Sequence, residues 1–137
     1  MTLAAQTVAE AVRARIGVSA YTSHPQPFDE SELPAWRVEY EPETTEFATL
    51  AGGIVQHKLP LRLKGYARSV TDLPAALNAM AATALPLVFA APVPYGLEPD
   101  GEITREMASQ GEAAVGVIDI PVRAMYFTAT TAPETIL

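Results

Sequence analysis

The chain has 137 residues, 49% of them hydrophobic and 18% charged, so it can bury the core of one domain and is not disordered by composition. Its formal net charge of −7 argues against general affinity for nucleic acids or anionic membranes, because phosphate binding requires clustered positive charge. The sequence contains no cysteine, which excludes disulfides, zinc–thiolate sites and thiol nucleophiles.

The first residues predict an amphipathic helix. Apolar side chains recur at spacings of three to five over residues 3–16, Thr2 can cap the helix, and Gly17 can follow its end. The segment carries internal charges and no long apolar run, so we expect no signal peptide. No stretch reaches the roughly 18 apolar residues of a membrane span, and we expect a soluble protein made in the cytoplasm.

Two short extended segments come next. A strand is predicted at residues 18–22 and another at 35–41, with a proline-rich acidic loop between them. Residues 43–53 form a long connection with an apolar centre at Phe47 and Leu50.

The segment 57–68, HKLPLRLKGYAR, predicts a strand with one apolar row and one basic row, because its residue types alternate with a period of two. The basic row holds four of the nine Lys and Arg residues: Lys58, Arg62, Lys64 and Arg68. At roughly 3.3 Å per residue the segment reaches about 40 Å. This exceeds the usual strand length of about five or six residues, so we expect part of it to project beyond the sheet.

The remainder predicts a helix and a hairpin. Capping residues and an apolar i, i+4 stripe predict a helix over residues 72–84 that stops before Pro86. Residues 85–101 are too rich in proline for regular structure beyond a short extended piece. Strands at 102–109 and 114–128 then form a hairpin.

Together these elements predict a single α+β domain over residues 1–137. We expect a mostly antiparallel sheet of about four to five strands, with two helices packed on one face. Pro60 and Pro121 interrupt two of the strands, which indicates edge strands or bulges at these positions.

The sequence contains no pattern typical of catalysis or metal binding. His24 and His57 are the only histidines, and their spacing matches no metal motif; we expect His24 in a surface loop and His57 at a surface or interface. A Ser23–His24–Asp29 site lacks both a nucleophile elbow and an oxyanion motif. We therefore predict no catalytic residue, no cofactor, no metal site and no enzymatic activity.

Acidic residues gather just before the basic strand. Seven of the sixteen lie within 18 positions: Asp29, Glu30, Glu32, Glu39, Glu41, Glu43 and Glu46. The acidic and basic rows can both be solvated surface. Alternatively, the basic row can pair with an acidic surface of a neighbouring subunit, or contact passing DNA.

The order of elements and several phrases resemble a known family. The matching pieces are an opening helix that ends in ARIG, the segment YTSHPQPFDESELPAWRVEYEPE, the strand and capped helix LPLRLKGYARSVTDLPAALNAMA, and the ending GVIDIPVRAMYFTAT. In these features the chain resembles the tail terminators, also called tail completion or minor tail protein U-like proteins, of long-tailed bacteriophages and gene transfer agents. Residues 85–101 match no part of this pattern.

The resemblance implies a virion protein at the head-proximal end of the tail. Such a subunit forms a homo-hexameric ring on the tail tube protein, ends tube growth and joins the tail to the head–tail connector, or stopper, protein. DNA passes through the ring without specific binding, and no membrane, catalytic residue or cofactor is implied. The family's long hairpin beside the channel corresponds to residues 41–68 here.

The interface residues are chosen from the sequence alone. They are Lys58, Arg62, Lys64, Arg68, Glu43, Glu46, Phe47 and Leu50. Two other functions stay open: a head–tail stopper or tail tube subunit, and a small ligand-binding or enzymatic α+β domain. A tube subunit polymerises without limit, whereas a terminator closes one ring.

Overall fold

The computed structural model describes residues 4–17, 19–22, 33–49, 52–69, 71–90, 95–110 and 113–137. The elements follow in the order α1 (Ala4–Ile16), β1 (Ala20–Tyr21), β2 (Ala35–Tyr40), β3 (Thr44–Phe47), β4 (Ile54–Ser69), α2 (Leu73–Val88), β5 (Gly96–Pro99), β6 (Thr104–Gln110), β7 (Ala113–Ala129) and β8 (Ala132–Ile136).

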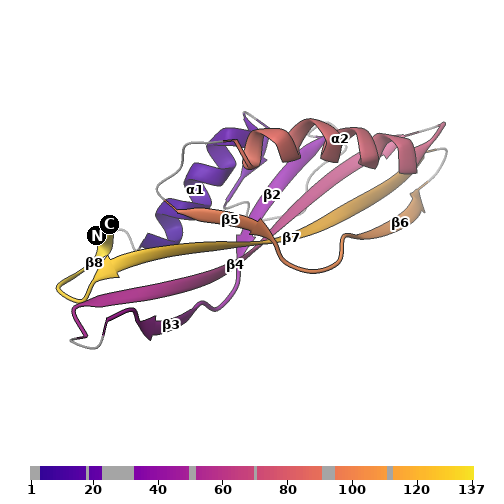
Figure 1. Ribbon diagram of the computed structural model, residues 1–137. Helices are drawn as coiled ribbons and strands as arrows, with labels where there is room; N and C mark the ends of the chain where they lie inside the picture. The colour runs from indigo at the N-terminus through magenta and orange to yellow at the C-terminus, as the bar shows by residue number, and fades with distance from the viewer. Residues whose placement is uncertain are drawn as a thin grey trace.

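Two long strands, β4 and β7, form the centre of the sheet. They pair antiparallel along their whole length, from Ile54 opposite Ala129 to Ser69 opposite Ala114. On the side away from β7, β4 pairs with β2 and β3. On the side away from β4, β7 pairs with β5, β6 and β8. Because β1 runs parallel to β2, the eight-stranded sheet is mixed. It is curled, and both helices lie on one side of it (Figure 1).

The predicted fold class is therefore wrong: the sequence predicts four to five mostly antiparallel strands, whereas the sheet has eight and is mixed. The three strands that the sequence does not predict, β3, β5 and β8, have only four or five residues each. They lie at edges and bury little, so they carry no apolar alternation. Their backbone partners are on β4 and β7: β3 and β8 pair with the strand next to them in sequence, whereas β6 separates β5 from its partner β7.

Residues near the ends of the two helices explain where α1 ends and where α2 begins. Arg13 and Arg15 lie in the last turn of α1, and Gly17 follows with φ of 123°, which glycine adopts without steric cost. The Asp72 carboxylate caps α2 by accepting the Ala75 N–H at 3.1 Å. The prediction that α2 stops before Pro86 is wrong. The helix continues to Val88, because a proline in the last turn removes only one intrahelical hydrogen bond.

The core lies between the helices and the face of the sheet turned toward them, here called the inner face. Alternate residues of β4 and β7 point into it, including the fully buried Leu59, Leu61 and Leu63. Helix α2 approaches the sheet closely at Gly116, where an added Cβ would lie 2.9 Å from Leu73 Cδ2. The opposite, outer face carries the charged residues of β4.

Pro60 and Pro121 do not mark edge strands, contrary to the sequence expectation, since both lie in the central pair. Each proline lies between two short strands that pair, one after the other, with the same side of its long strand. The carbonyl of Pro60 accepts the Glu41 N–H between β3 and β2, and that of Pro121 accepts the Asp100 N–H between β6 and β5. In an antiparallel strand the N–H and C=O of one residue point to the same side. The missing N–H of each proline therefore faces a break in pairing, where no ladder bond is lost.

Candidate functional site

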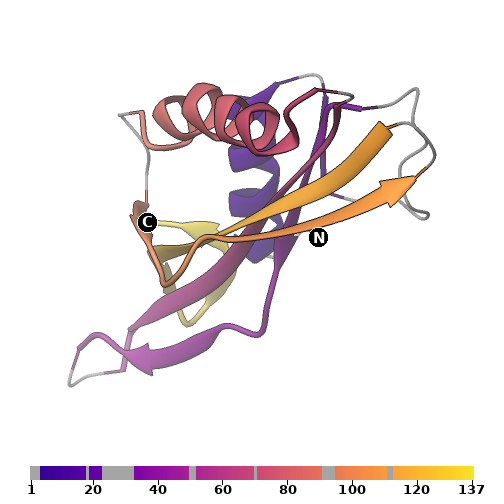
Figure 2. The ribbon, with the colours of Figure 1, turned by 90° about the vertical axis from the view of Figure 1, so that its right-hand side faces the viewer.

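The hairpin of β3 and the first residues of β4 extends past the helices (Figure 2). We call residues 44–58 the arm; within it, residues 50 and 51 lie outside the described chain, so nothing is said of the predicted contact Leu50. All four β3 residues are exposed, and Phe47 is 67% exposed. A Cβ added to Gly52 would lie 3.7 Å from the Phe47 ring, so the ring lies beside Gly52 at the end of the hairpin. The arm presents side chains that the domain's own core does not use.

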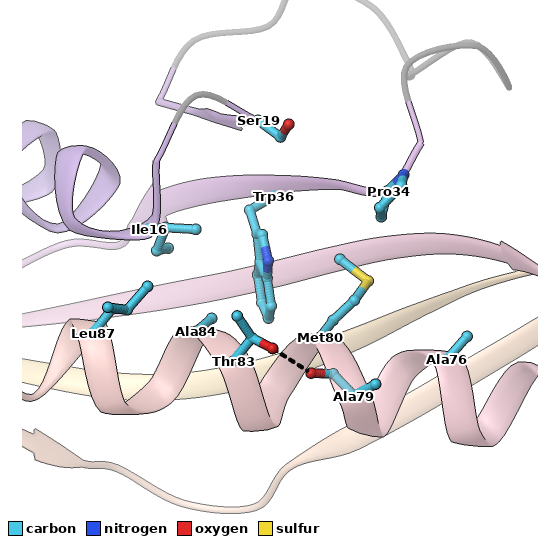
Figure 3. A pocket seen from close by; sticks show the side chains of 10 residues that line it. All are labelled: Ile16, Ser19, Pro34, Trp36, Ala76, Ala79, Met80, Thr83, Ala84 and Leu87. Atoms are coloured by element: carbon cyan, nitrogen blue, oxygen red, sulfur yellow. Dashed lines mark hydrogen bonds between the residues drawn. The ribbon is translucent and has the colours of Figure 1, made fainter.

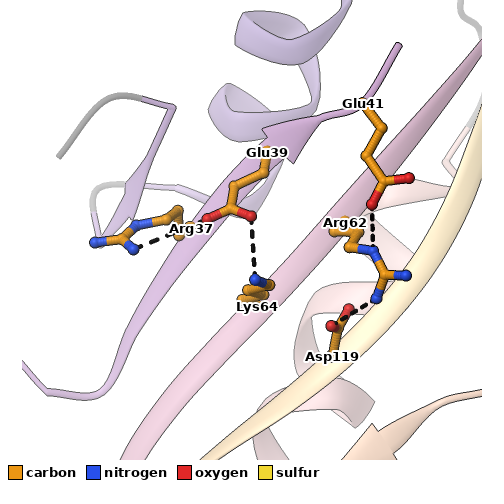
Figure 4. Close-up of polar contacts among 6 residues, drawn as sticks. All are labelled: Arg37, Glu39, Glu41, Arg62, Lys64 and Asp119. Carbon is orange, nitrogen blue, oxygen red and sulfur yellow. Dashed lines mark hydrogen bonds and ion pairs between the residues drawn. The ribbon is translucent and has the colours of Figure 1, made fainter. Parts of the chain in front are cut away.

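Arg62 and Lys64, two of the four predicted basic contacts, form ion pairs across neighbouring strands. Arg62 makes ion pairs with Glu41 at 2.5 Å and with Asp119 at 2.8 Å, and Lys64 pairs with Glu39 at 3.1 Å (Figure 4). The hydrogen bond that Arg62 donates to Glu41, followed by the one that it donates to Asp119, raises the pKa of Arg62. The acidic and basic rows thus neutralise each other in part on the outer face.

The other two basic residues lie toward opposite ends of β4. Lys58, on the arm, makes no ion pair with any residue that the structure describes. Arg68 is exposed near the opposite end of β4. Among the predicted contacts, Lys58, Glu46 and Phe47 lie together on the arm, whereas Arg62, Lys64 and Arg68 lie along the body of the sheet.

Glu43 and His57 belong to a polar cluster at the edge of the core, which the sequence analysis does not identify; His57, Tyr126 and Thr128 are buried in it, whereas Glu43 is partly exposed. Tyr126 Oη donates a hydrogen bond to Glu43 Oε2 at 2.6 Å, and His57 Nδ1 lies 3.2 Å from the same oxygen. His57 Nε2 lies 2.8 Å from Thr128 Oγ1. The rings of His57 and Tyr126 stack with centroids 4.6 Å apart and planes inclined by 6°. Burial, followed by the hydrogen bond to Glu43, raises the pKa of Tyr126.

The expected surface or interface position of His57 is therefore wrong. His57 continues the apolar row of β4 at the same two-residue phase as Leu59, and that phase is the signal that predicts an inward side chain. The line from carboxylate through imidazole to hydroxyl resembles the geometry of an acid–base relay. However, the hydroxyl residue Thr128 is only 1% exposed, so no substrate reaches it. We interpret the cluster as the satisfied polar end of the core, which joins the residue preceding β3 to β4 and β7.

An apolar pocket of about 410 Å³ lies between α2, β2 and the end of α1 (Figure 3). Its ten lining residues are Ile16, Ser19, Pro34, Trp36, Ala76, Ala79, Met80, Thr83, Ala84 and Leu87. The Thr83 hydroxyl donates to the Ala79 carbonyl at 3.0 Å, and none of the ten side chains is titratable. The pocket can accommodate an apolar group but offers no acid, base or metal ligand.

The remaining candidates give no second site. The Ser23, His24 and Asp29 combination lies outside the described residues. Within the residues that are described, no group of three or more His, Asp or Glu side chains could hold a metal ion. Over the same ranges, no helix is both long and apolar enough to cross a membrane.

The comparisons with known proteins add no identification. No protein-family model matches the chain, and no curated protein matches it either.

Proposed function

We propose that this chain is a structural subunit that forms a ring at the head-proximal end of a bacteriophage-type tail tube, ends tube growth and meets the head connector. The observation that carries this proposal is the arm. Its β3 strand is exposed along its whole length, and its Phe47 side chain lies in solvent in the isolated subunit. Large exposed side chains beyond a well-packed core are typical of surfaces that other proteins cover.

The charged outer face supports the same proposal. Arg62 and Lys64 pair with acidic side chains of neighbouring strands, so the face presents alternating positive and negative charges along β4. Complementary charge patterns select partners and fix the register of a contact more than they add affinity. A ring subunit requires such register, because every copy must meet the next at the same angle.

The first test is the mass of the purified protein, measured with and without tail tube protein. We expect a closed ring near six subunits that caps or shortens tubes. A stable monomer that leaves tube length unchanged would contradict the terminator function. Unlimited polymerisation would instead indicate a tube subunit, and a ring that binds connector protein but not tubes would indicate a stopper.

Phe47→Ala tests whether the arm carries the contact. We expect tube capping to weaken by about tenfold or more, since truncating an exposed aromatic anchor typically costs over 1 kcal/mol of binding. Met107→Ala is the matched control, because Met107 on β6 is also large, apolar and 55% exposed. Equal effects of both substitutions, or none from Phe47→Ala, would count against the arm.

The apolar pocket favours one alternative, a small domain that binds an apolar ligand. Trp36 is the only tryptophan and lines the pocket, so its fluorescence reports occupancy directly. Saturable fluorescence changes with a small apolar probe, in a protein that stays monomeric with tubes present, would favour this alternative.

A further inference from the structure

Two charged side chains of the outer face stand apart from its ion-pair network. Lys58 on the arm and Glu106 on β6 make no ion pair with any residue in the described ranges, whereas Arg62 and Lys64 between them do. Both side chains point to the same face, because their strand partners Met125 and Val117 belong to the outward-facing row of β7. On this face Lys58 is a cation and Glu106 an anion without a partner of opposite charge among the described residues. Glu46, on the arm beside Lys58, is a second such anion.

Glu106 lines a hollow of about 350 Å³ on the outer face between β4 and β6. The full lining is Lys64, Tyr66, Thr104, Glu106, Val117 and Asp119. Asp119 Oδ2 accepts from Arg62, but Asp119 Oδ1 is buried and has no hydrogen-bond donor among the described residues. A buried carboxylate oxygen without a donor is unfavourable. Since Lys64 already pairs with Glu39, the hollow is suited to an incoming cation that brings N–H donors.

The chain's own Lys58 cannot be that cation. Asp119 lies directly opposite Lys64 across the central pair, and Lys64 is six residues along β4 from Lys58. Six residues of strand span roughly 20 Å, which is far beyond the reach of a lysine side chain. Glu106 pairs opposite Val117, which lies opposite Tyr66, so it is still farther from Lys58. Any contact between Lys58 and this hollow joins two molecules.

We propose that Lys58 on the arm of one copy enters the hollow of the next copy and donates hydrogen bonds to Asp119 Oδ1 and Glu106. This inference rests on the proposed ring function and names the contact that would join its subunits. Each copy gives one lysine and receives one; when the giver and the receiver are two different neighbours, the contact is heterologous and closes a ring when the rotation permits. The arm extends beyond the helices (Figure 2), and the Lys58 side chain on it is partly exposed.

The test uses two charge reversals, Lys58→Glu and Glu106→Lys, each purified separately and then mixed in equal amounts. Self-association is followed by light scattering and native mass spectrometry, and circular dichroism checks the fold. Neither side chain has an ion pair to lose among the described residues, so both variants should fold. We expect each alone to associate about tenfold or more weakly, because like charges then meet. The mixture should regain assembly with the two variants alternating. The Lys58→Glu arm then meets the Glu106→Lys hollow, and the unchanged Lys58 arm meets an unchanged Glu106.

Failure of the mixture to assemble, or wild-type assembly by either single variant, would overturn the contact. The contact would also be overturned if the wild-type protein stays monomeric and Glu106→Lys abolishes tube binding. The cation that enters the hollow would then come from the tube subunit and not from Lys58 of another copy. Glu134→Gln is the control, because Glu134 lies on β8, outside both the arm and the hollow; it should leave assembly unchanged. A restored ring that fails to cap tubes would overturn the terminator function and leave the contact in place.

Discussion

The same two strands, β4 and β7, run through two regions that are built differently. Where α1 and α2 cover the sheet, the inward side chains are aliphatic and fully buried, as at Leu61 and Val122. Where the strands approach the arm, the inward positions are taken by His57 and Thr128, which are buried with a hydrogen-bonding contact between them. The body is held by nondirectional apolar burial, whereas the base of the arm is held by directional polar contacts.

We therefore expect the body of the domain to determine its stability, and the arm and outer face to determine what it binds. Removing body contacts should lower the free energy of unfolding, because the core cannot refill the lost volume. Changes on the outer face or at the arm should cost little stability, because the side chains there contact solvent. The predictions below test this contrast, from the largest effect on stability to the smallest.

Leu61→Ala should have the largest effect. Leu61 is fully buried on β4 and lies between Tyr40 of β2 and Val122 of β7 in the ladder. We expect a loss of about 2–5 kcal/mol in the free energy of unfolding, measured by urea denaturation. Phe47→Ala, which also truncates a large apolar side chain but on the arm, should stay within about 0.5 kcal/mol. Similar losses from the two changes would remove the distinction between body and arm.

Gly65→Ala should be the next most costly change. A Cβ at this position would lie 2.9 Å from the Trp36 ring and 3.0 Å from Ile118 Cγ2, so the core would have to shift. We expect a loss of about 1–3 kcal/mol, read from the same urea titrations. Gly53→Ala on the arm is the matched control, because a Cβ there meets nothing within 4 Å. A neutral Gly65→Ala would show that the body is packed more loosely than the contacts indicate.

Tyr126→Phe tests the polar cluster. It removes the hydroxyl that donates to Glu43, and we expect a loss of about 1 kcal/mol at neutral pH. Burial and the Glu43 contact raise the pKa of Tyr126 above its ordinary 10.0, so the folded protein keeps this proton to higher pH than the unfolded chain does. The stability of the wild type should therefore fall as the pH rises above about 10. The variant lacks this contribution, so the difference between the two proteins should shrink over the same range. A constant difference would contradict the assigned contact.

Arg62→Met should have the smallest effect of the four. The Arg62 side chain is 41% exposed, and its pairs with Glu41 and Asp119 lie on the outer face. We expect a loss of about 0–1 kcal/mol, which should decrease further in about 1 M salt. Denaturation at low and high salt measures both values. A loss above about 2 kcal/mol would mean that the outer face contributes to stability like the body.

The internal pairing of Arg62 and Lys64 also changes how the basic row should be tested. A double reversal to Glu would place like charges beside Glu39, Glu41 and Asp119 within the same chain. Loss of assembly in that variant could then follow from a disturbed sheet. Lys58 gives a cleaner test, because its reversal breaks no ion pair among the described residues.

Local patterns in the sequence were sufficient for the elements with a strong periodic signal. The alternation in β4 predicts which side chains face the core, and the capping residue Asp72 predicts the start of α2. Burial on one face enforces such patterns, because a one-residue slip would expose the whole apolar row. The same alternation predicts that Lys58 and Arg62 share the outer face.

The tertiary structure alone decided the rest. β3, β5 and β8 exist because β4 and β7 are long enough to offer them backbone partners, and short exposed strands leave no local signal. Glu43 is 14 residues from His57 and 83 from Tyr126, so no spacing in the sequence brings their side chains together. The sequence by itself determined which faces are apolar and charged, because that depends on neighbouring residues. Which charges meet depended on the pairing of distant strands, and that pairing placed Arg62 against Asp119 and left Lys58 on the arm.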